Sequence, residues 1–337
     1  MLNMKEASYY KKLKDENVQC VLCPRKCIIK KGSYGFCNAR RNINGKLYSI
    51  VYSNPCAVHI DPIEKKPLYH FLPGSKALSV GTIGCNLECK HCQNWTMSRA
   101  KPEEITIQNI SPEEIVEIAI KNNCKIISYT YNEPTVFFEY MLDCAKIAKK
   151  KGLKNTIVSN GFINEEPLKE LCKYIDGANI DLKAFNNKFY KDTCSAWLEP
   201  VLNSLKILKQ KKVWLEVTNL IIPTLNDDLD EIKKMCIWIK ENLGIDVPLH
   251  FTGFYPSYKL LNLPGTSPEI LKKARKAALN IGIKYSYVGN VFAAEENNTY
   301  CPKCGKLLIE RSGFDTIKNN IKNNKCSCGE KIEGVFN

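Results

Sequence analysis

Three cysteines, Cys85, Cys89 and Cys92, are the part of this sequence most capable of chemistry, and they follow the spacing C-x3-C-x2-C. Three thiolates complete neither a tetrahedral zinc site nor a fully ligated cubane. The spacing therefore indicates an iron–sulfur cluster with one iron left open to a substrate or cofactor. The alternative is a zinc knuckle with a distant fourth ligand. It is disfavoured because the motif directly follows a strand-like run, residues 77–80, as a barrel enzyme requires.

This triplet resembles the signature of the radical S-adenosylmethionine (SAM) superfamily, in which an aromatic residue precedes the last cysteine. His91 occupies that place here. The resemblance implies that the amino and carboxylate groups of SAM chelate the open iron. An electron from the [4Fe-4S] cluster then cleaves the sulfonium bond and releases a 5′-deoxyadenosyl radical.

Two further groups of cysteines predict metal sites at the two ends of the chain. Cys20, Cys23, Cys27 and Cys37 lie in a segment too small to bury a core, which indicates a metal-stapled module and favours zinc over a second iron–sulfur cluster. Near the carboxyl end, Cys301, Cys304, Cys326 and Cys328 form two knuckles, each followed by glycine, a pattern typical of a zinc ribbon. The six remaining cysteines are single and are interpreted as small core residues: Cys56, Cys124, Cys144, Cys172, Cys194 and Cys236.

Between residues 76 and 292 the pattern alternates strand and helix, which predicts an α/β fold with a parallel sheet. The predicted strands are 76–83, 125–131, 154–159, 177–183, 213–221, 248–254 and 285–289. The predicted helices include 111–123, 135–151, 166–175, 229–243 and 268–281, with capped starts at Ser111 and Ser267. Six to seven units are fewer than a full TIM barrel has, and they fit the partial (β/α)6 barrel of the radical SAM superfamily. The expected domains are 1–75 (cysteine module and linker), 76–295 (barrel) and 296–337 (zinc ribbon).

Because chemistry gathers at the carboxyl ends of parallel strands, the residues there are candidate SAM contacts. Asn132 and Glu133 follow the second strand, where the family binds the amino group of SAM; a plain turn with a helix cap is the alternative. Ser159 and Asn160 end the third strand and resemble the Thr-Asn-Gly turn that the family uses near the ribose and carboxylate of SAM. Gly161 supplies the tight turn.

The fourth strand ends in Asp181-Leu182-Lys183, and strand alternation places both charged residues on one face. Charges that point into a barrel need partners, which favours a site over a surface ladder. The run resembles the glycyl-radical-enzyme activating enzymes. That resemblance implies that Lys183 pairs with the carboxylate of SAM and that Asp181 anchors it. On the sixth strand, His250 is either a satisfied core histidine or a further site residue.

The linker at residues 61–74 and the seventh strand narrow the resemblance. With the amino-terminal cysteines, they resemble the AmmeMemoRadiSam-system radical SAM proteins, relatives of the pyruvate formate-lyase activating enzyme. That resemblance implies Memo-type and AMMECR-type partner proteins. One departure is Gly253, where related proteins carry an arginine. The prolines of the linker predict an extended segment, either a plain tether or one lying over the mouth of the active site.

Composition limits the alternatives. The 337-residue chain begins without a signal-peptide pattern and has no run of eighteen apolar residues, so we expect a cytoplasmic protein with reduced thiols and no membrane span. A net charge of +14 permits nucleic-acid binding but does not establish it. The favoured function is a radical SAM enzyme that takes electrons from a donor such as flavodoxin or ferredoxin and acts on an unidentified substrate. A glycyl-radical activase, an RNA-modifying enzyme and a non-enzymatic zinc scaffold are the alternatives.

Overall fold

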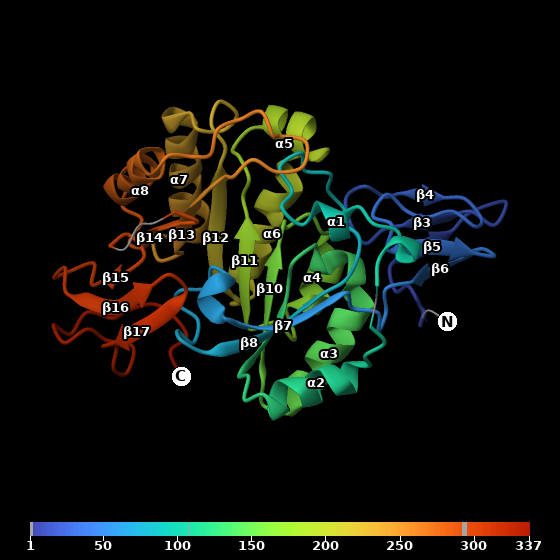
Figure 1. Cartoon of the computed structure of the whole chain (residues 1–337), viewed down its shortest axis with the longest axis horizontal. Coiled ribbons are helices and arrows are strands. Elements are labelled where there is room, and N and C mark those ends of the chain that lie inside the picture. The colour runs from blue at the N-terminus through green and yellow to red at the C-terminus, as the bar shows by residue number, and fades with distance from the viewer. Residues whose placement is uncertain (1–2, 107, 292–294) are drawn as a thin grey trace.

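An eight-stranded sheet forms the centre of the molecule (Figure 1). The structure is a computed structural model that describes residues 3–106, 108–291 and 295–337. Its strand order is β14-β13-β12-β11-β10-β9-β8-β7, with β8 to β14 parallel and β7 antiparallel to β8 at one edge. The bounds are Ala57–Pro62 (β7), Lys76–Gly81 (β8), Ile126–Tyr129 (β9), Lys154–Ser159 (β10), Gly177–Asp181 (β11), Trp214–Ile221 (β12), Leu249–Gly253 (β13) and Ser286–Gly289 (β14).

Helices follow most of the parallel strands and flank the sheet (Figure 1). Helix α3 packs on β9 and β10, α6 on β12, and α8 on β13 and β14. The helices are α1 (Trp95–Ser98), α2 (Pro112–Lys121), α3 (Phe138–Lys150), α4 (Glu165–Leu171), α5 (Asn187–Cys194), α6 (Glu199–Gln210), α7 (Leu229–Leu243) and α8 (Pro268–Ile281), with 3-10 turns at Ile63–Lys65 (η1), Pro102–Glu104 (η2) and Pro134–Phe137 (η3).

All seven predicted strands are present, each within two residues of its predicted ends, and the partial barrel is confirmed. The predicted caps are present as well: Ser111 Oγ accepts a hydrogen bond from the backbone N–H of Glu114, and Ser267 Oγ accepts one from Ile270. Helices α5 and α6 were not among the predicted ones. Asn186 caps α5 by accepting from the N–H of Phe189 at 2.7 Å, a side-chain signal that the sequence analysis did not use.

The amino-terminal module packs directly on the barrel. It consists of two small sheets, β1-β6-β5 and β2-β3-β4. Its buried side chains belong to the same hydrophobic core as the barrel, and Arg40 forms a buried ion pair with Glu139 of α3 at 2.7 Å. The strands are Lys5–Glu6 (β1), Tyr10–Lys12 (β2), Val18–Cys20 (β3), Ile28–Ile29 (β4), Arg40–Ile43 (β5) and Lys46–Ser49 (β6).

Residues 57–75, predicted to belong with the amino-terminal module, are part of the barrel. The segment supplies β7 to the sheet, and residues 68–71 are almost fully buried. The Pro67 carbonyl accepts from Asn179 Nδ2 at 2.8 Å, and the ring of Phe71 lies against Gly177, the first residue of β11. The linker therefore plugs the amino-terminal end of the barrel. It does not lie over the mouth at the carboxyl ends of the strands, as one reading of the sequence had it.

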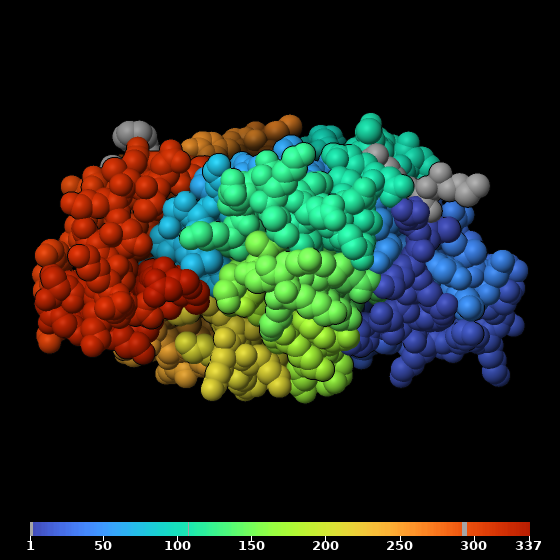
Figure 2. Space-filling model, turned by 90° about the horizontal axis from the view of Figure 1, so that it is seen from below, coloured from blue at the N-terminus to red at the C-terminus, as the bar shows by residue number. Residues whose placement is uncertain are grey.

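The carboxyl-terminal module forms the antiparallel sheet β15-β16-β17 (Thr299–Tyr300, Leu307–Ser312, Asp315–Asn319). It closes over the plugged end of the barrel through buried polar contacts. Arg311 donates to the carbonyl of Tyr69 at 2.8 Å, and Thr316 Oγ1 donates to Glu64 at 2.6 Å. The two terminal modules lie at opposite ends of the molecule, with the barrel between them (Figure 2).

Within the described residues, no helix is long and apolar enough to cross a membrane.

Candidate functional site

The cysteine loop, residues 82–94, begins at the carboxyl end of β8. Parallel register brings the ends of β9, β10 and β11 beside it, because β8 pairs with β9, β9 with β10 and β10 with β11. Two predicted site residues reach the loop from these ends. Asn132 Nδ2 donates to the carbonyl of Gly84 at 2.7 Å, and Asn160 Nδ2 donates to Asn86 Oδ1 at 2.9 Å. Asn132 and Asn160 are thus brought beside the loop that carries the three cysteines.

Backbone contacts fix the loop from the other side. The N–H groups of Glu88 and Lys90 donate to the carbonyls of Cys194 and Thr193 at the end of α5, at 3.0 and 2.9 Å. Gly84 has a φ of +91°, and a Cβ at this position would lie 2.3 Å from the carbonyl oxygen of Cys37. Only glycine allows so close an approach to the amino-terminal module.

Two thiols of the loop, Cys85 and Cys89, have neighbouring donors that suit a thiolate ligand. Cys85 Sγ accepts from the N–H of Leu87 at 3.4 Å and lies 3.9 Å from Asn160 Nδ2. A hydrogen bond with Cys194 and the charge of Lys183 lower the pKa of Cys89. A set of three thiols, held in place by neighbouring strands, fits a [4Fe-4S] cluster whose fourth iron has no protein ligand.

Lys183 and Asp181 form an ion pair beside the loop, with Lys183 Nζ 2.9 Å from Asp181 Oδ2. Burial by itself lowers the pKa of Lys183, but the Asp181 carboxylate and the Cys89 and Cys194 thiols outweigh burial and raise it. The side chain of Asp181 remains about one-third exposed. The pair therefore offers a fixed positive charge next to Cys89.

Glu133 and Ser159 form a hydrogen bond with each other. Buried Glu133 accepts from Ser159 Oγ at 2.8 Å, from the N–H of Asn160 at 2.8 Å and from both the N–H and the hydroxyl of Thr135. Burial raises the pKa of Glu133. With these partners the carboxylate ties the end of β9 to the end of β10, so its structural contribution is to position Asn160.

His91 is buried near Cys89 and Cys194, and the three side chains offer ligand atoms within 4.8 Å of one another. Burial, together with the charge of Lys183, lowers the pKa of His91 to about 3, so its ring is neutral. Cys194 was interpreted from the sequence as a small core residue. It is indeed buried, but it also contacts the cluster loop, and no local sequence signal indicates this because the contact joins α5 to a loop a hundred residues earlier.

His250 does not lie with the other candidates. It is the second residue of β13, near the amino end, and its Nε2 is 2.7 Å from Glu216 Oε2. Although burial raises the pKa of Glu216, the hydrogen bond from His250 makes the net shift downward. Glu216 also accepts the N–H groups of Tyr69 and His70 in the linker. His250 is therefore a core histidine paired with Glu216, and its interpretation as a further site residue was wrong.

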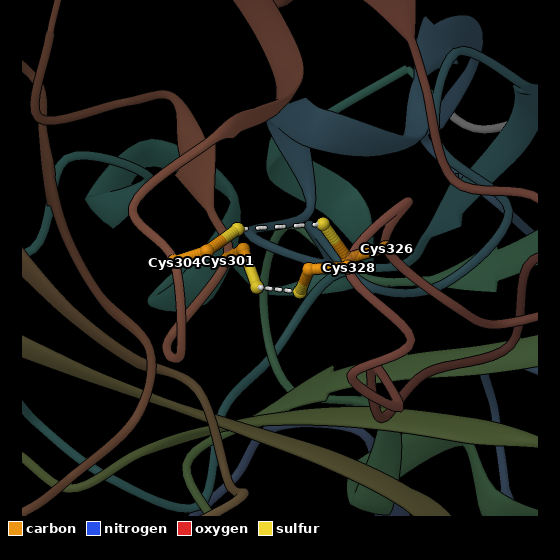
Figure 3. A group of neighbouring side chains, drawn as sticks. All are labelled: Cys301, Cys304, Cys326 and Cys328. Carbon is orange, nitrogen blue, oxygen red and sulfur yellow. Dashed lines mark hydrogen bonds between the residues drawn. The ribbon is translucent and has the colours of Figure 1, made fainter.

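The two remaining cysteine sets differ in geometry. The sulfur atoms of Cys301, Cys304, Cys326 and Cys328 converge within 4.8 Å, with Cys301–Cys328 and Cys304–Cys326 each at 3.7 Å (Figure 3). Gly305 and Gly329 both have positive φ, and the N–H of each turns back to the first cysteine carbonyl of its knuckle. Such a set suits a tetrahedral metal ion. Cys20, Cys23, Cys27 and Cys37 instead line one cavity between the amino-terminal module and the barrel.

Comparison with known proteins agrees with this geometry. The Radical SAM superfamily profile matches residues 79–239. The chain is 50% identical over 336 residues to the uncharacterized protein MJ0808 of Methanocaldococcus jannaschii, covering 99% of this chain and 100% of that protein. It is 23% identical to a pyruvate formate-lyase-activating enzyme of Clostridium pasteurianum, over 57% of this chain and 86% of that enzyme.

Among solved structures, a radical SAM methyltransferase from Sphaerobacter thermophilus has a TM-score of 0.51 at 14% identity. The match covers 70% of this chain and 71% of that one and shows a shared fold. With the C-x3-C-x2-C loop at the carboxyl end of β8 of a partial barrel, these matches show that the chain belongs to the radical SAM superfamily, is related to pyruvate formate-lyase-activating enzymes and is a radical SAM enzyme.

Proposed function

We propose that this chain cleaves SAM reductively and uses the resulting 5′-deoxyadenosyl radical to abstract hydrogen from a substrate. One observation carries the proposal: the loop with Cys85, Cys89 and Cys92 is held by hydrogen bonds from two neighbouring strand ends and from α5, with a largely buried cation beside it. When bound, the cluster and SAM together supply one-electron cleavage of the sulfonium bond.

The chain's own residues would bind and orient SAM. Lys183 holds a proton and faces Cys89, so it is placed to receive an anionic group such as the carboxylate of SAM. Asp181 fixes that ammonium in position and keeps part of its carboxylate accessible. Asn132 donates a hydrogen bond to the backbone of the loop, and the carboxylate of Glu133 accepts hydrogen bonds from Thr135, Ser159 and Asn160. Both side chains are therefore used in positioning the residues around the site.

A protein substrate is the second candidate, as in glycyl-radical activation. The relatives include two putative glycyl-radical enzyme activating enzymes of Methanocaldococcus jannaschii, which are 26% and 29% identical to this chain. A second observation favours it. The rings of Trp95 and Tyr258 stack with their centroids 5.2 Å apart. They lie beside the cysteine loop, because Ser257 Oγ donates a hydrogen bond to the carbonyl of Cys92. Trp95, Tyr255 and Leu261 are exposed there, which gives this rim an apolar surface suited to a peptide chain.

The finer assignment to the AmmeMemoRadiSam system, with its Memo-type and AMMECR-type partners, rests on sequence motifs alone. A one-electron donor of the ferredoxin or flavodoxin class is a partner that the chemistry itself requires.

The test is anaerobic incubation of the reduced, iron-loaded protein with SAM, followed by chromatography of the nucleoside products. We expect 5′-deoxyadenosine from the natural chain and none from Cys85→Ala, Cys89→Ala or Cys92→Ala, because a cubane held by two thiolates loses its site-differentiated iron. Cys236→Ala, in a buried thiol on α7, is the matched control and should retain activity. Unchanged product formation in any of the three loop variants would contradict the assignment.

A further inference from the structure

The amino-terminal cysteines face a shared cavity that also touches the catalytic loop. Its lining includes Cys20, Cys23, Cys27, Cys37, Arg40 and Asn86. Asn86 directly follows Cys85, and its backbone carbonyl accepts from Arg25 Nε of the amino-terminal module. The cavity therefore has the catalytic loop as one of its walls.

Arg40 is a buried cation without enough partners. Its Nη2 donates to Glu139 at 2.7 Å, while Nε and Nη1, both buried, have no hydrogen-bond partner within the part of the chain that the structure describes. Unpaired buried donors are costly. In a cavity that four cysteines share, the missing partner is an anionic centre made of thiolates and metal.

The spacing of the sulfur atoms separates the two kinds of metal centre. A single zinc ion with Zn–S bonds of about 2.3 Å holds four sulfurs within about 4 Å of one another. The carboxyl-terminal cysteines come near that spacing, since all four sulfurs lie within 4.8 Å of one another and two pairs are 3.7 Å apart. No three of the amino-terminal thiols come that close, although all four lie in the described part of the chain. Cluster ligands bind different irons and stand farther apart.

We propose that Cys20, Cys23, Cys27 and Cys37 hold an auxiliary iron–sulfur cluster, with Arg40 donating hydrogen bonds to its sulfur atoms. This proposal reverses the preference for zinc that was drawn from the sequence. The number of residues between cysteines indicates which thiols can meet, but it does not fix the distances between their sulfur atoms, and those distances distinguish zinc from a cluster.

The position of this centre suggests its role. The carbonyl of Cys37 packs against Gly84, one residue before the first catalytic cysteine. A cluster with four protein ligands has no open iron, so it can only accept and pass electrons. A one-electron donor of the ferredoxin or flavodoxin class reduces it, and it passes that electron to the catalytic cluster without making or breaking a bond. This relay role rests on the proposed function, whereas the existence of the cluster does not.

The test removes the catalytic cluster and asks what iron remains. The full chain carrying Cys85→Ala, Cys89→Ala and Cys92→Ala is reconstituted anaerobically with iron and sulfide. We expect about two to four irons per chain, matching sulfide, and an electron paramagnetic resonance signal on reduction with dithionite. The matched control adds Cys23→Ser and Cys27→Ser to the same chain and should lose that iron and the signal. Circular dichroism checks that both variants fold.

Iron at background level in the triple variant, together with about two zincs per chain, would overturn the proposal and restore zinc to this module. Retained iron in the triple variant, with no SAM cleavage by the natural chain, would support the auxiliary cluster and reject the proposed function. Reductive titration counts the redox centres: the natural chain should take up about two electrons, and the triple variant about one.

Discussion

At the scale of single residues, the charge on Lys183 is the feature that most directly links structure to chemistry. Its ammonium is buried, yet Asp181 and the neighbouring thiols raise its pKa, so it stays protonated at neutral pH. A buried cation beside three cysteines attracts an anionic ligand. Because neither Lys183 nor Asp181 is a cluster ligand, we expect that removing either side chain weakens ligand binding more than it disturbs the cluster.

We predict that Lys183→Ala weakens SAM binding about tenfold or more while the iron absorbance is retained, because one charge-assisted hydrogen bond is lost without touching an iron ligand. Asp181→Ala should weaken binding in the same direction. Lys154→Ala is the control, since Lys154 forms a comparable pair with Asp176 away from the site. Equilibrium dialysis with SAM measures the effect, and natural affinity in both site variants would move the SAM site elsewhere. An unpaired buried charge can also cost about 1–3 kcal/mol, so melting temperatures are compared alongside.

At the scale of elements, the cysteine loop depends on four neighbouring elements that are distant in sequence. The ends of β9 and β10 hold it through Asn132 and Asn160, α5 holds it through its last two carbonyls, and the amino-terminal module packs on Gly84. Because the loop has almost no regular secondary structure, its shape is set by these contacts.

We predict that Gly84→Ala disrupts the loop and lowers iron content, since its Cβ would lie 2.3 Å from the backbone oxygen of Cys37, which cannot move aside as a flexible side chain could. Gly152→Ala is the matched control. Gly152 has a similar φ of +79° and no atoms near its Cβ position, so it bears only the left-handed backbone cost of about 1–2 kcal/mol. Equal iron content and equal melting temperature in the two variants would mean that the close approach does not matter.

At the scale of the whole molecule, the carboxyl-terminal module is tied to the barrel by buried groups, whereas its four clustered cysteines all belong to the module itself. Arg311 donates a hydrogen bond to the backbone carbonyl of Tyr69 in the linker. His70, also in the linker, donates from Nδ1 to the backbone carbonyl of Glu333 at 2.7 Å. Tyr69, Tyr285 and Tyr287 share a core with Leu308 and Ile332 of the module. The boundary at residue 296 therefore does not separate independent units.

We predict that truncation after Glu296 lowers the free energy of unfolding by at least about 3 kcal/mol, because it exposes this core and leaves buried linker groups without partners. Cys304→Ser, which disrupts the metal site but keeps Arg311, should lose about one zinc with little change in iron. Metal analysis and thermal unfolding together distinguish the two effects. A truncated chain as stable as the natural one would show that the module is only appended.

The plugged end of the barrel should also make stability depend on pH. His70 is fully buried and neutral: its Nδ1–H donates to Glu333, and its Nε2 accepts from the hydroxyl of Tyr287. Burial lowers the pKa of His70 to about 4. Below the ordinary histidine pKa of about 6.5 the unfolded chain binds a proton that the folded chain does not, so stability falls as the pH falls from about 6.5 toward 4.

We predict that acidification from pH 7 to pH 5 costs the natural chain about 2 kcal/mol more than it costs His70→Gln. His59→Gln, in an exposed histidine on β7, should behave like the natural chain. Anaerobic urea unfolding at the two pH values measures the difference. Parallel losses in the natural chain and His70→Gln would show that His70 does not titrate as its burial requires.

Much of this architecture could be predicted from local pattern. The β8 to β14 strands follow from runs of apolar residues between turn signals, and the capped helices follow from Ser-Pro-Glu starts. The three-cysteine spacing limits the number of thiolates on one cluster, and that number alone leaves an iron open. Asn132, Asn160, Asp181 and Lys183 were predicted to lie near the cysteines because the carboxyl ends of parallel strands must share one edge.

Only the tertiary structure decided which buried polar groups and thiols become partners. The sequence could not show that His250 pairs with Glu216, that the linker enters the amino-terminal end of the barrel, or that Cys194 meets Cys89. It also could not set the sulfur separations that distinguish the two four-cysteine sites. The physical reason is that spacing and periodicity act over a few residues, whereas a buried charge or thiol is stabilised by partners that the fold brings from tens to hundreds of residues away.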